Sequence, residues 1–235
     1  MDQPGPEQLR AVVFDLDGTL LDHRSSTRAG LTEWLAGRGI PFDDDVERAW
    51  FTAEEEHFGA WRRGEIEHGE QRRRRLRDFL PAVGLPVGAD DELDTVFLAY
   101  LDAYRRAWRG YDDVDAAVEL VQSRGLATAI LTNGTPELQE AKLDRLGLLD
   151  RIGPVLCATA IGAKKPDPAA FRATYERLGL APEQVLYVGD EHEVDVVGAR
   201  AAGLQAVLLD RDGDGPYDEP ERINSLDELK RYLPG

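Results

Sequence analysis

Two aspartates, Asp15 and Asp17, end the first apolar stretch of the chain, and their types and spacing suit catalysis. They follow Val12–Phe14 and precede Gly18, whose backbone freedom suits a tight turn. A carboxylate at the end of a buried strand is costly unless a partner uses its charge. An aspartate can attack phosphorus to form an aspartyl-phosphate, and a second carboxylate can protonate the leaving group and later activate water. The alternative is a strand followed by an ordinary acidic turn.

Further polar residues follow later apolar runs, at Thr132, Lys165 and Asp190, with Asp195 close behind. If the strands are parallel, these side chains meet at one edge of the sheet. Neighbouring carboxylates repel one another, and oxygen ligands of this kind favour Mg²⁺. A lysine and a hydroxyl opposite the metal would hold phosphoryl oxygens. Each residue alone has an ordinary explanation as a cap, a solvated lysine or a turn former. Their recurrence at successive strand ends favours a site.

The elements that must position these residues alternate along the chain. Apolar strand patterns alternate with helical patterns and turn residues, which predicts βαβ units and a parallel sheet of the α/β class. Strands are expected at 12–14, 126–132, 154–159, 185–189 and 205–210, and helices at 114–124, at 136–146, from 168 onward and up to 202.

The segment 22–110 has a different texture, rich in arginine, glutamate and aromatic residues at helical spacing. Glycine and proline breaks separate its helices, and no part of it predicts a strand. We therefore expect an all-helical domain at 22–110, inserted into a core domain made of 10–21 and 111–235.

Four short segments resemble, in order, the four motifs of the haloacid dehalogenase superfamily. They are DLDGT at 15–19, TNG at 132–134, KPDP at 165–168 and GDEHEVD at 189–195. The resemblance is to a phosphatase-type member with a helical cap of the C1 type. It implies a Rossmann-like three-layer core, Asp15 as nucleophile and Asp17 as general acid and base.

The resemblance also implies how the phosphate group is held. Thr132 and Lys165 match the phosphate-contacting residues of the family, and Asn133 beside Thr132 is a further candidate. Of the two neighbouring lysines, Lys165 fits better than Lys164 because it directly precedes the proline.

A magnesium site is implied in the same way. Its ligands would be Asp15, the main-chain carbonyl of Asp17, and Asp190, with Asp195 supporting the site from behind.

The second aspartate favours one reaction within the family. Hydrolytic dehalogenases resemble this chain but lack an aspartate at the position of Asp17, and the family's ion pumps need membrane helices. We predict Mg²⁺-dependent hydrolysis of a small phosphorylated metabolite, such as a nucleotide or sugar phosphate. The alternatives are a phosphomutase of the same family and a phosphate-sensing binding protein without turnover.

The helical segment offers weaker signals for the substrate. Arg72–Arg75 and Arg77 could attract an anion, but a solvated helix face paired with local glutamates is the favoured interpretation. Aromatic residues at helical spacing usually pack in a core; here they are Trp34, Trp50, Trp61 and Trp108. His23 follows the first motif closely and is a weak candidate for a substrate contact.

The composition of the chain limits which partners and cellular locations it can be expected to have. The chain has 45 acidic and 28 basic residues, a net charge of −17, which argues against nucleic acid and anionic membranes as partners. No apolar stretch approaches the ~18 residues of a membrane span. The single Cys157 is expected to be a small buried residue. With no signal-peptide pattern at the N-terminus, we expect a cytoplasmic monomer or homodimer.

The segment 210–221 satisfies the residue pattern of a calcium-binding EF-hand loop. A strand pattern precedes it, however, and Pro216 and Pro220 obstruct an exiting helix. We therefore predict a charged surface loop after the last strand of the core.

Overall fold

The computed structural model describes residues 9–213, 215–216 and 218–235, so the N-terminal segment examined for a signal peptide lies outside the described residues. The chain divides into two compact units. The sheet unit contains the described residues up to His23 together with Arg109–Gly235, and the helical unit is Arg24–Trp108.

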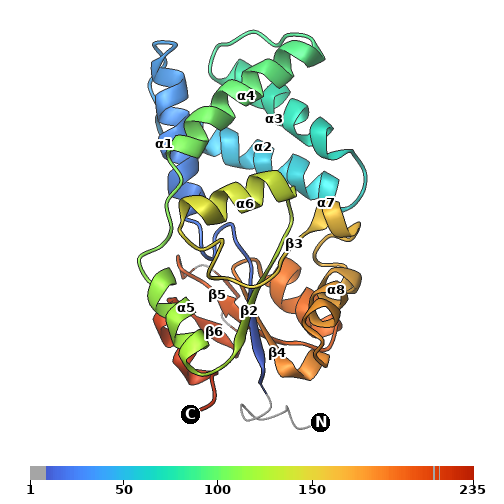
Figure 1. The fold of residues 1–235 in the computed structure, drawn as a ribbon. Coiled ribbons are helices and arrows are strands. Elements are labelled where there is room, and N and C mark those ends of the chain that lie inside the picture. The colour runs from blue at the N-terminus through green and yellow to red at the C-terminus, as the bar shows by residue number, and fades with distance from the viewer. Residues whose placement is uncertain (1–8, 214, 217) are drawn as a thin grey trace. The chain divides into compact units, whose positions relative to one another are not determined.

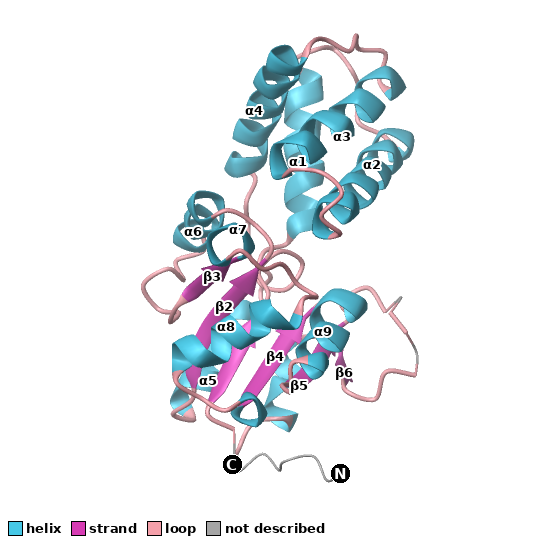
Figure 2. Cartoon of the chain, turned by 90° about the vertical axis from the view of Figure 1, so that its right-hand side faces the viewer, coloured by secondary structure: helices cyan, strands magenta, loops and turns pink. Residues whose placement is uncertain are grey.

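The sheet unit is built on six strands in the order β3-β2-β1-β4-β5-β6, all pairs parallel (Figure 2). They are β1 (Ala11–Phe14), β2 (Ala127–Thr132), β3 (Val155–Cys157), β4 (Val185–Gly189), β5 (Gln205–Leu209) and β6 (Arg222–Ile223). The predicted parallel α/β sheet is confirmed. The strand β6 was not predicted, because two residues are too short to produce a recognisable pattern.

Helices cover both faces of this sheet. Figure 1 shows α5 (Val114–Ser123) and α8 (Pro168–Leu178) on opposite sides of the strands. On the α8 side, Val13 and Tyr187 of the sheet pack in one core with Phe171. The remaining helical segments are α6 (Pro136–Arg145), α7 (Ala158–Ile161), η2 (Pro182–Gln184), the π-helix η3 (His192–Val197), α9 (Gly198–Ala201) and η4 (Leu226–Arg231). The Rossmann-like three-layer core is thereby confirmed.

The helical unit contains α1 (His23–Ala36), α2 (Asp44–Arg62), α3 (His68–Ala82) and α4 (Asp90–Arg106). Its core is aromatic. The fully buried Trp50 ring lies 5.0 Å from the ring of Phe79 and 4.4 Å from that of Tyr100, centroid to centroid. All four tryptophans of the chain are buried in this unit, so they pack as the helical spacing predicted.

Four of the five arginines of α3 pair with acidic residues of the helical unit. Arg73 donates two hydrogen bonds to Asp94, at 2.8 and 2.6 Å, and Arg77 donates one to Glu70. The expectation that the whole run is solvated is wrong for Arg75, which is 5% exposed and donates to Glu54 at 2.5 Å. Its guanidinium lies 5.3 Å from the Trp50 ring, and the energy of this cation–π contact favours burial.

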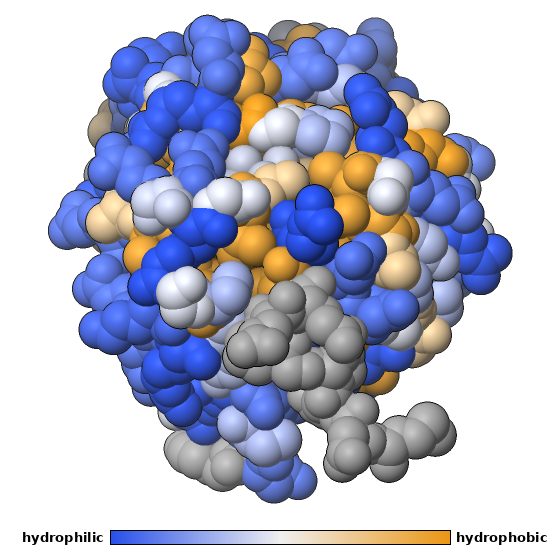
Figure 3. All heavy atoms as spheres, turned by 60° about the horizontal axis from the view of Figure 1, so that its bottom comes forward, coloured by the Kyte–Doolittle hydropathy of each residue, from blue (hydrophilic) through white to orange (hydrophobic). Residues whose placement is uncertain are grey.

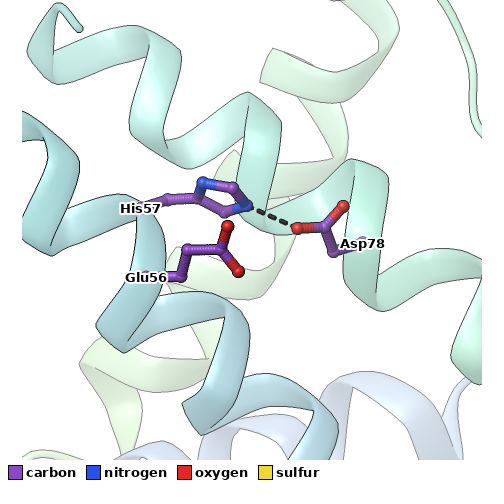
Figure 4. A group of neighbouring side chains, drawn as sticks. All are labelled: Glu56, His57 and Asp78. Carbon is purple, nitrogen blue, oxygen red and sulfur yellow. Dashed lines mark hydrogen bonds and ion pairs between the residues drawn. The ribbon is translucent and has the colours of Figure 1, made fainter. Parts of the chain in front are cut away.

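Another side-chain contact, besides that of Arg75 with Glu54, joins α2 to α3. His57 of α2 and Asp78 of α3 approach to 2.5 Å between Nε2 and Oδ2, with the Glu56 carboxylate beside them (Figure 4). The ring of His57 is nearly buried while Asp78 is exposed, so the pair lies at the edge of the helix contact.

The chain leaves and re-enters the sheet unit at one place. Leu21 and Gly110 form an antiparallel bridge, and the Asp22 amide donates to the Arg109 carbonyl at 3.0 Å. The Arg109 guanidinium also contacts the Asp22 carboxylate at 3.0 Å. We call residues 20–22 and 109–111 the stem. The two ends of the intervening segment are therefore pinned side by side.

The acidic segment after β5 folds back on itself. The Asp210 carboxylate accepts hydrogen bonds from the amides of Gly213 and Gly215, at 3.0 and 3.2 Å, and Glu219 pairs with Arg200 at 2.7 Å. The expectation that this loop follows the last strand is wrong, since it connects β5 to β6.

Hydrophilic residues predominate on the face shown in Figure 3, with hydrophobic atoms visible between them. Such mixing is ordinary, because apolar atoms contribute about half of the surface of a soluble protein. Among the described residues, no helix combines the length and the apolar character required to cross a bilayer.

Candidate active site

The candidate site lies at the carboxyl ends of three adjacent strands of the sheet unit. Asp15 directly follows β1, Thr132 ends β2, and Asp190 follows β4. Because β1 pairs with both β2 and β4 in parallel, the three residues emerge at the same edge. The amide of Asp15 donates to the Val188 carbonyl at 2.9 Å, which continues the β1–β4 pairing up to the site.

A buried lysine joins two of the aspartates. Lys165 Nζ donates to Asp15 Oδ1 at 2.5 Å and to Asp195 Oδ1 at 2.7 Å. Its third hydrogen bond goes to the hydroxyl of Tyr187, at 2.8 Å. All three N–H groups of the ammonium are thus used, which satisfies a charge whose side chain is only 3% exposed. The structure thus joins Asp15 and Lys165, which sequence analysis assigned to separate strand ends, and brings Asp195 to them.

Three groups fix the position of Lys165. Asn133 holds its main chain with two hydrogen bonds, from Nδ2 to the Lys165 carbonyl at 3.0 Å and from the Lys165 amide to Oδ1 at 2.9 Å. Tyr187 in turn donates to the Leu131 carbonyl at 3.0 Å. The Asp195 carboxylate is oriented by the Glu191 amide, at 3.0 Å. Tyr187 was missed by sequence analysis because an aromatic residue inside a strand looks like core.

Asp190 lies against the turn at Gly18 and Thr19 that follows the two aspartates. The Thr19 hydroxyl donates to Asp190 Oδ1 at 3.1 Å. Gly18 has φ +87°, and a Cβ atom there would lie 2.1 Å from Asp190 Oδ2. Both the backbone conformation and the space therefore require glycine at this position.

Asp17 has partners that sequence analysis did not identify. Lys142 of α6 places Nζ at 2.7 Å from both carboxylate oxygens of Asp17, and Gln139 donates to Oδ2 at 3.1 Å. His23 Nδ1 lies 4.0 Å from Asp17 Oδ1, so this weak candidate is close to the site. Gln139 also donates to Thr132 Oγ1 at 2.5 Å, which engages the hydroxyl predicted to contact phosphate.

The two aspartates of the first motif have different electrostatic environments. Burial raises the pKa of Asp15 to about 7, because the opposing effect of Lys165 does not fully compensate desolvation and the nearby Asp195. For Asp17, desolvation also raises the pKa, but Lys142 and His23 outweigh it and hold the pKa below its usual value. The higher pKa thus belongs to Asp15, and a cation beside this carboxylate would lower its pKa and favour the ionised form that a nucleophile needs.

The acidic residues fit a divalent cation. Carboxylate oxygens of Asp15, Asp190 and Asp195 lie within 4.8 Å of one another. Burial and the charges of Asp15 and Asp195 raise the pKa of Asp190 well above its usual value. When all four carboxylates are ionised, with Asp17 counted, they exceed the ammonium groups of the two lysines by two negative charges, which a divalent cation would neutralise.

A parallel, three-layer α/β fold with a carboxylate and ammonium cluster at its strand ends defines an enzyme of Rossmann-like architecture. Residues 9–203 match the family model of the haloacid dehalogenase-like hydrolases. The match covers most of the chain, and the chain belongs to this family.

Named relatives agree with this assignment, and a solved structure shares the fold. A phosphoserine phosphatase of Thermus thermophilus is 31% identical, over 94% of this chain and 98% of that protein. A ribulose-1,5-bisphosphate 5-phosphatase of Halopiger xanaduensis is 32% identical, over 92% of this chain and 89% of that protein. The crystal structure of the putative HAD-hydrolase YfnB from Bacillus subtilis superimposes with a TM-score of 0.83 at 24% identity, covering 96% of this chain and 98% of that chain.

Proposed function

We propose that this protein is a Mg²⁺-dependent phosphatase that hydrolyses a small phosphate monoester through an aspartyl-phosphate. The observation that carries the proposal is the pair Asp15 and Asp17, two residues apart at the end of the central strand and held by separate lysines. The named phosphatases among the relatives support hydrolysis of phosphoric monoesters.

In this proposal Asp15 is the nucleophile. Its carboxylate oxygen attacks phosphorus, and the bond from phosphorus to the ester oxygen breaks as the aspartyl-phosphate forms. Asp17 gives a proton to the departing ester oxygen, then takes one from the water that hydrolyses the acyl phosphate. Enzymes that carry out such hydrolysis reach rate enhancements of up to ~10²¹.

Lys165 and the residues around it would stabilise the transferring group. The ammonium lies 2.5 Å from the nucleophile oxygen, so it can offset charge that develops on the phosphoryl oxygens. Thr132 and Asn133 remain proposed phosphate contacts. Because the Asn133 side chain already holds the Lys165 main chain, its contact with phosphate would come from its own amide.

Mg²⁺ is the proposed cofactor, held by Asp15, Asp190 and the main-chain carbonyl of Asp17, with Asp195 supporting the site through Lys165. The cation would neutralise the phosphate charge that otherwise repels an approaching carboxylate.

The proposed substrate is a small phosphorylated metabolite. The two relatives are named for a phosphorylated amino acid and for a sugar bisphosphate, which supports this class of substrate without selecting a member. Four of the five arginines of α3 are engaged by acids of the helical unit, and the guanidinium of the fifth, Arg72, lies 5.0 Å from the centroid of the Phe97 ring, so they offer little support for an additional anion contact. We propose that the helical unit is the cap that selects the substrate.

Phosphate release from a panel of amino acid, sugar, nucleotide and glycolate phosphates tests the function. We expect Mg²⁺-dependent release by the wild-type protein, loss of release in Asp15→Asn, and release near the wild-type rate in the control Asp112→Asn, an exposed aspartate of the sheet unit. The proposal fails if no substrate releases phosphate or if Asp15→Asn is undiminished. Isomerised product would identify a mutase, and stable labelling without turnover would identify a sensor.

A further inference from the structure

The carboxylate of Asp17 is held from behind by two side chains of α6. Gln139 and Lys142 are three residues apart, so they share one face of the helix. Lys142 is almost fully buried, with a side chain 4% exposed, whereas that of Asp17 is 29% exposed. The lysine therefore contacts the carboxylate from the protein side while part of Asp17 stays open to a ligand.

The contact between Lys142 and Asp17 is symmetrical. Nζ lies 2.7 Å from Oδ1 and 2.7 Å from Oδ2, so rotation of the carboxylate about its terminal bond is opposed from both sides. Bringing an ammonium out of water is costly unless a partner compensates, and Asp17 supplies that compensation. A buried lysine at this position is consistent with a requirement for one carboxylate orientation.

Gln139 connects this carboxylate to the predicted phosphate contact. Its Nε2 donates to Asp17 Oδ2 at 3.1 Å and to Thr132 Oγ1 at 2.5 Å, one hydrogen for each. Gly134 makes room for it, because a Cβ atom there would lie 2.9 Å from Gln139 Nε2 and Cδ. Glycine at this position is therefore needed for close approach and not for a positive φ angle.

We propose that Lys142 and Gln139 are positioning residues that aim the Asp17 carboxylate at the ester oxygen of the substrate and couple its orientation to Thr132. This inference rests on the proposed function. Proton delivery matters most when the leaving group is a poor one, such as an alkoxide. Correct positioning of a general acid typically contributes about 10²–10⁴-fold to the rate.

The test compares kcat/KM for a simple alkyl phosphate and for 4-nitrophenyl phosphate, whose leaving group departs without a proton. We expect Lys142→Met to lose about 10²-fold or more on the alkyl ester but less than about 10-fold on the nitrophenyl ester. Asp17→Asn supplies the reference pattern, and Lys142→Arg should recover part of the alkyl activity. Arg145→Met removes an exposed charge one turn further along α6 and should change neither value.

Equal losses on the two esters in Lys142→Met would overturn the positioning role. If that variant does not fold by circular dichroism, Gln139→Leu is expected to show the same selective loss on the alkyl ester, and its absence would overturn the proposal. Failure of the wild-type protein to hydrolyse either ester would instead refute the proposed function.

Discussion

Replacing Lys165 by methionine removes the buried cation around which the candidate site is assembled. The ammonium donates to Asp15, Asp195 and Tyr187 at 2.5, 2.7 and 2.8 Å, and its side chain is 3% exposed. Methionine has a similar length but no charge, so two buried carboxylates lose their shared partner. Removing one member of a buried ion pair costs about 3–5 kcal/mol. We expect the free energy of unfolding to fall by that amount, a large share of the roughly 5–15 kcal/mol typical of a domain.

Urea unfolding in the presence of a chelator measures this loss. Circular dichroism is the suitable probe, because all four tryptophans lie in the helical unit and their fluorescence reports on that unit. Mg²⁺ should restore part of the lost stability, since a ligand at 100 times its Kd adds about 2.7 kcal/mol to the folded state. The control Lys164→Met removes the same charge one residue away and should cost less than about 1 kcal/mol.

Activity provides a second measurement on the same variants. Loss of one transition-state contact typically lowers kcat by about 10²–10³-fold, and we expect that loss for Lys165→Met but not for Lys164→Met. If Lys165→Met unfolds at the urea concentration of the wild-type protein in chelator, the contacts with Asp15 and Asp195 contribute no net stability. The argument from burial would then be wrong.

Three further substitutions test other features. Gly18→Ala should abolish Mg²⁺-dependent phosphate release, because the added Cβ would displace Asp190. The control Gly39→Ala, at φ +71° with no atom within 4 Å of the added Cβ, should cost only about 1–2 kcal/mol of stability in urea unfolding. Equal activity of the two variants would contradict the steric argument. His68 has its pKa lowered to about 4 by burial and by nearby arginines, so it stays neutral in the folded protein, and its contribution to stability is complete above about pH 6.5 and lost as the pH falls toward 4. Unfolding of His68→Gln should therefore depend less on pH in that window, and an unchanged slope would refute this assignment. Trp50→Ala should lower the free energy of unfolding by about 3–5 kcal/mol, measured by circular dichroism, because the ring is fully buried; a loss below 1 kcal/mol would show that the aromatic core repacks.

The strand ends of the site were predictable because one topological rule governs them. Once the strands are parallel, Asp15, Thr132 and Asp190 must emerge at the same edge, whatever the details of packing. The sequence alone therefore predicts that residues as far apart as 15 and 190 lie in one candidate site. Their roles in catalysis stay predictions.

The residues that hold these side chains in place could not be predicted from the sequence in the same way. Tyr187 lies inside an apolar strand, and only the coordinates show its hydroxyl against Lys165. Gln139 and Lys142 follow Thr132 by seven and ten residues on a helix with much polar surface. A partial signal existed, since Lys142 adjoins the buried Leu143, but solvated lysines beside buried leucines are common. The rotation of α6 about its axis decides whether this face meets the site, and tertiary packing fixes that rotation.

The arginine contacts of the helical unit were also only partly predictable from the sequence. The sequence predicts local pairing of the arginines on α3, and Arg74 and Arg77 do pair locally, with Glu70. Arg73 and Arg75 are different because their partners, Asp94 of α4 and Glu54 of α2, lie on other helices, and the Arg75 guanidinium also rests over Trp50. A contact between two helices depends on how they cross, which periodicity along one helix does not determine.

The stem has a consequence for how this protein can diversify. Leu21 pairs with Gly110 across 88 intervening residues, so the register of β1 beside β2 does not depend on what those residues are. Loop-closure entropy grows only slowly with length, by about 0.6 kcal/mol for each doubling. The segment 24–108 can therefore be lengthened, shortened or exchanged at little energetic cost to the strand that bears Asp15. Natural variation and engineering can thus alter one module while the reacting carboxylate keeps its place.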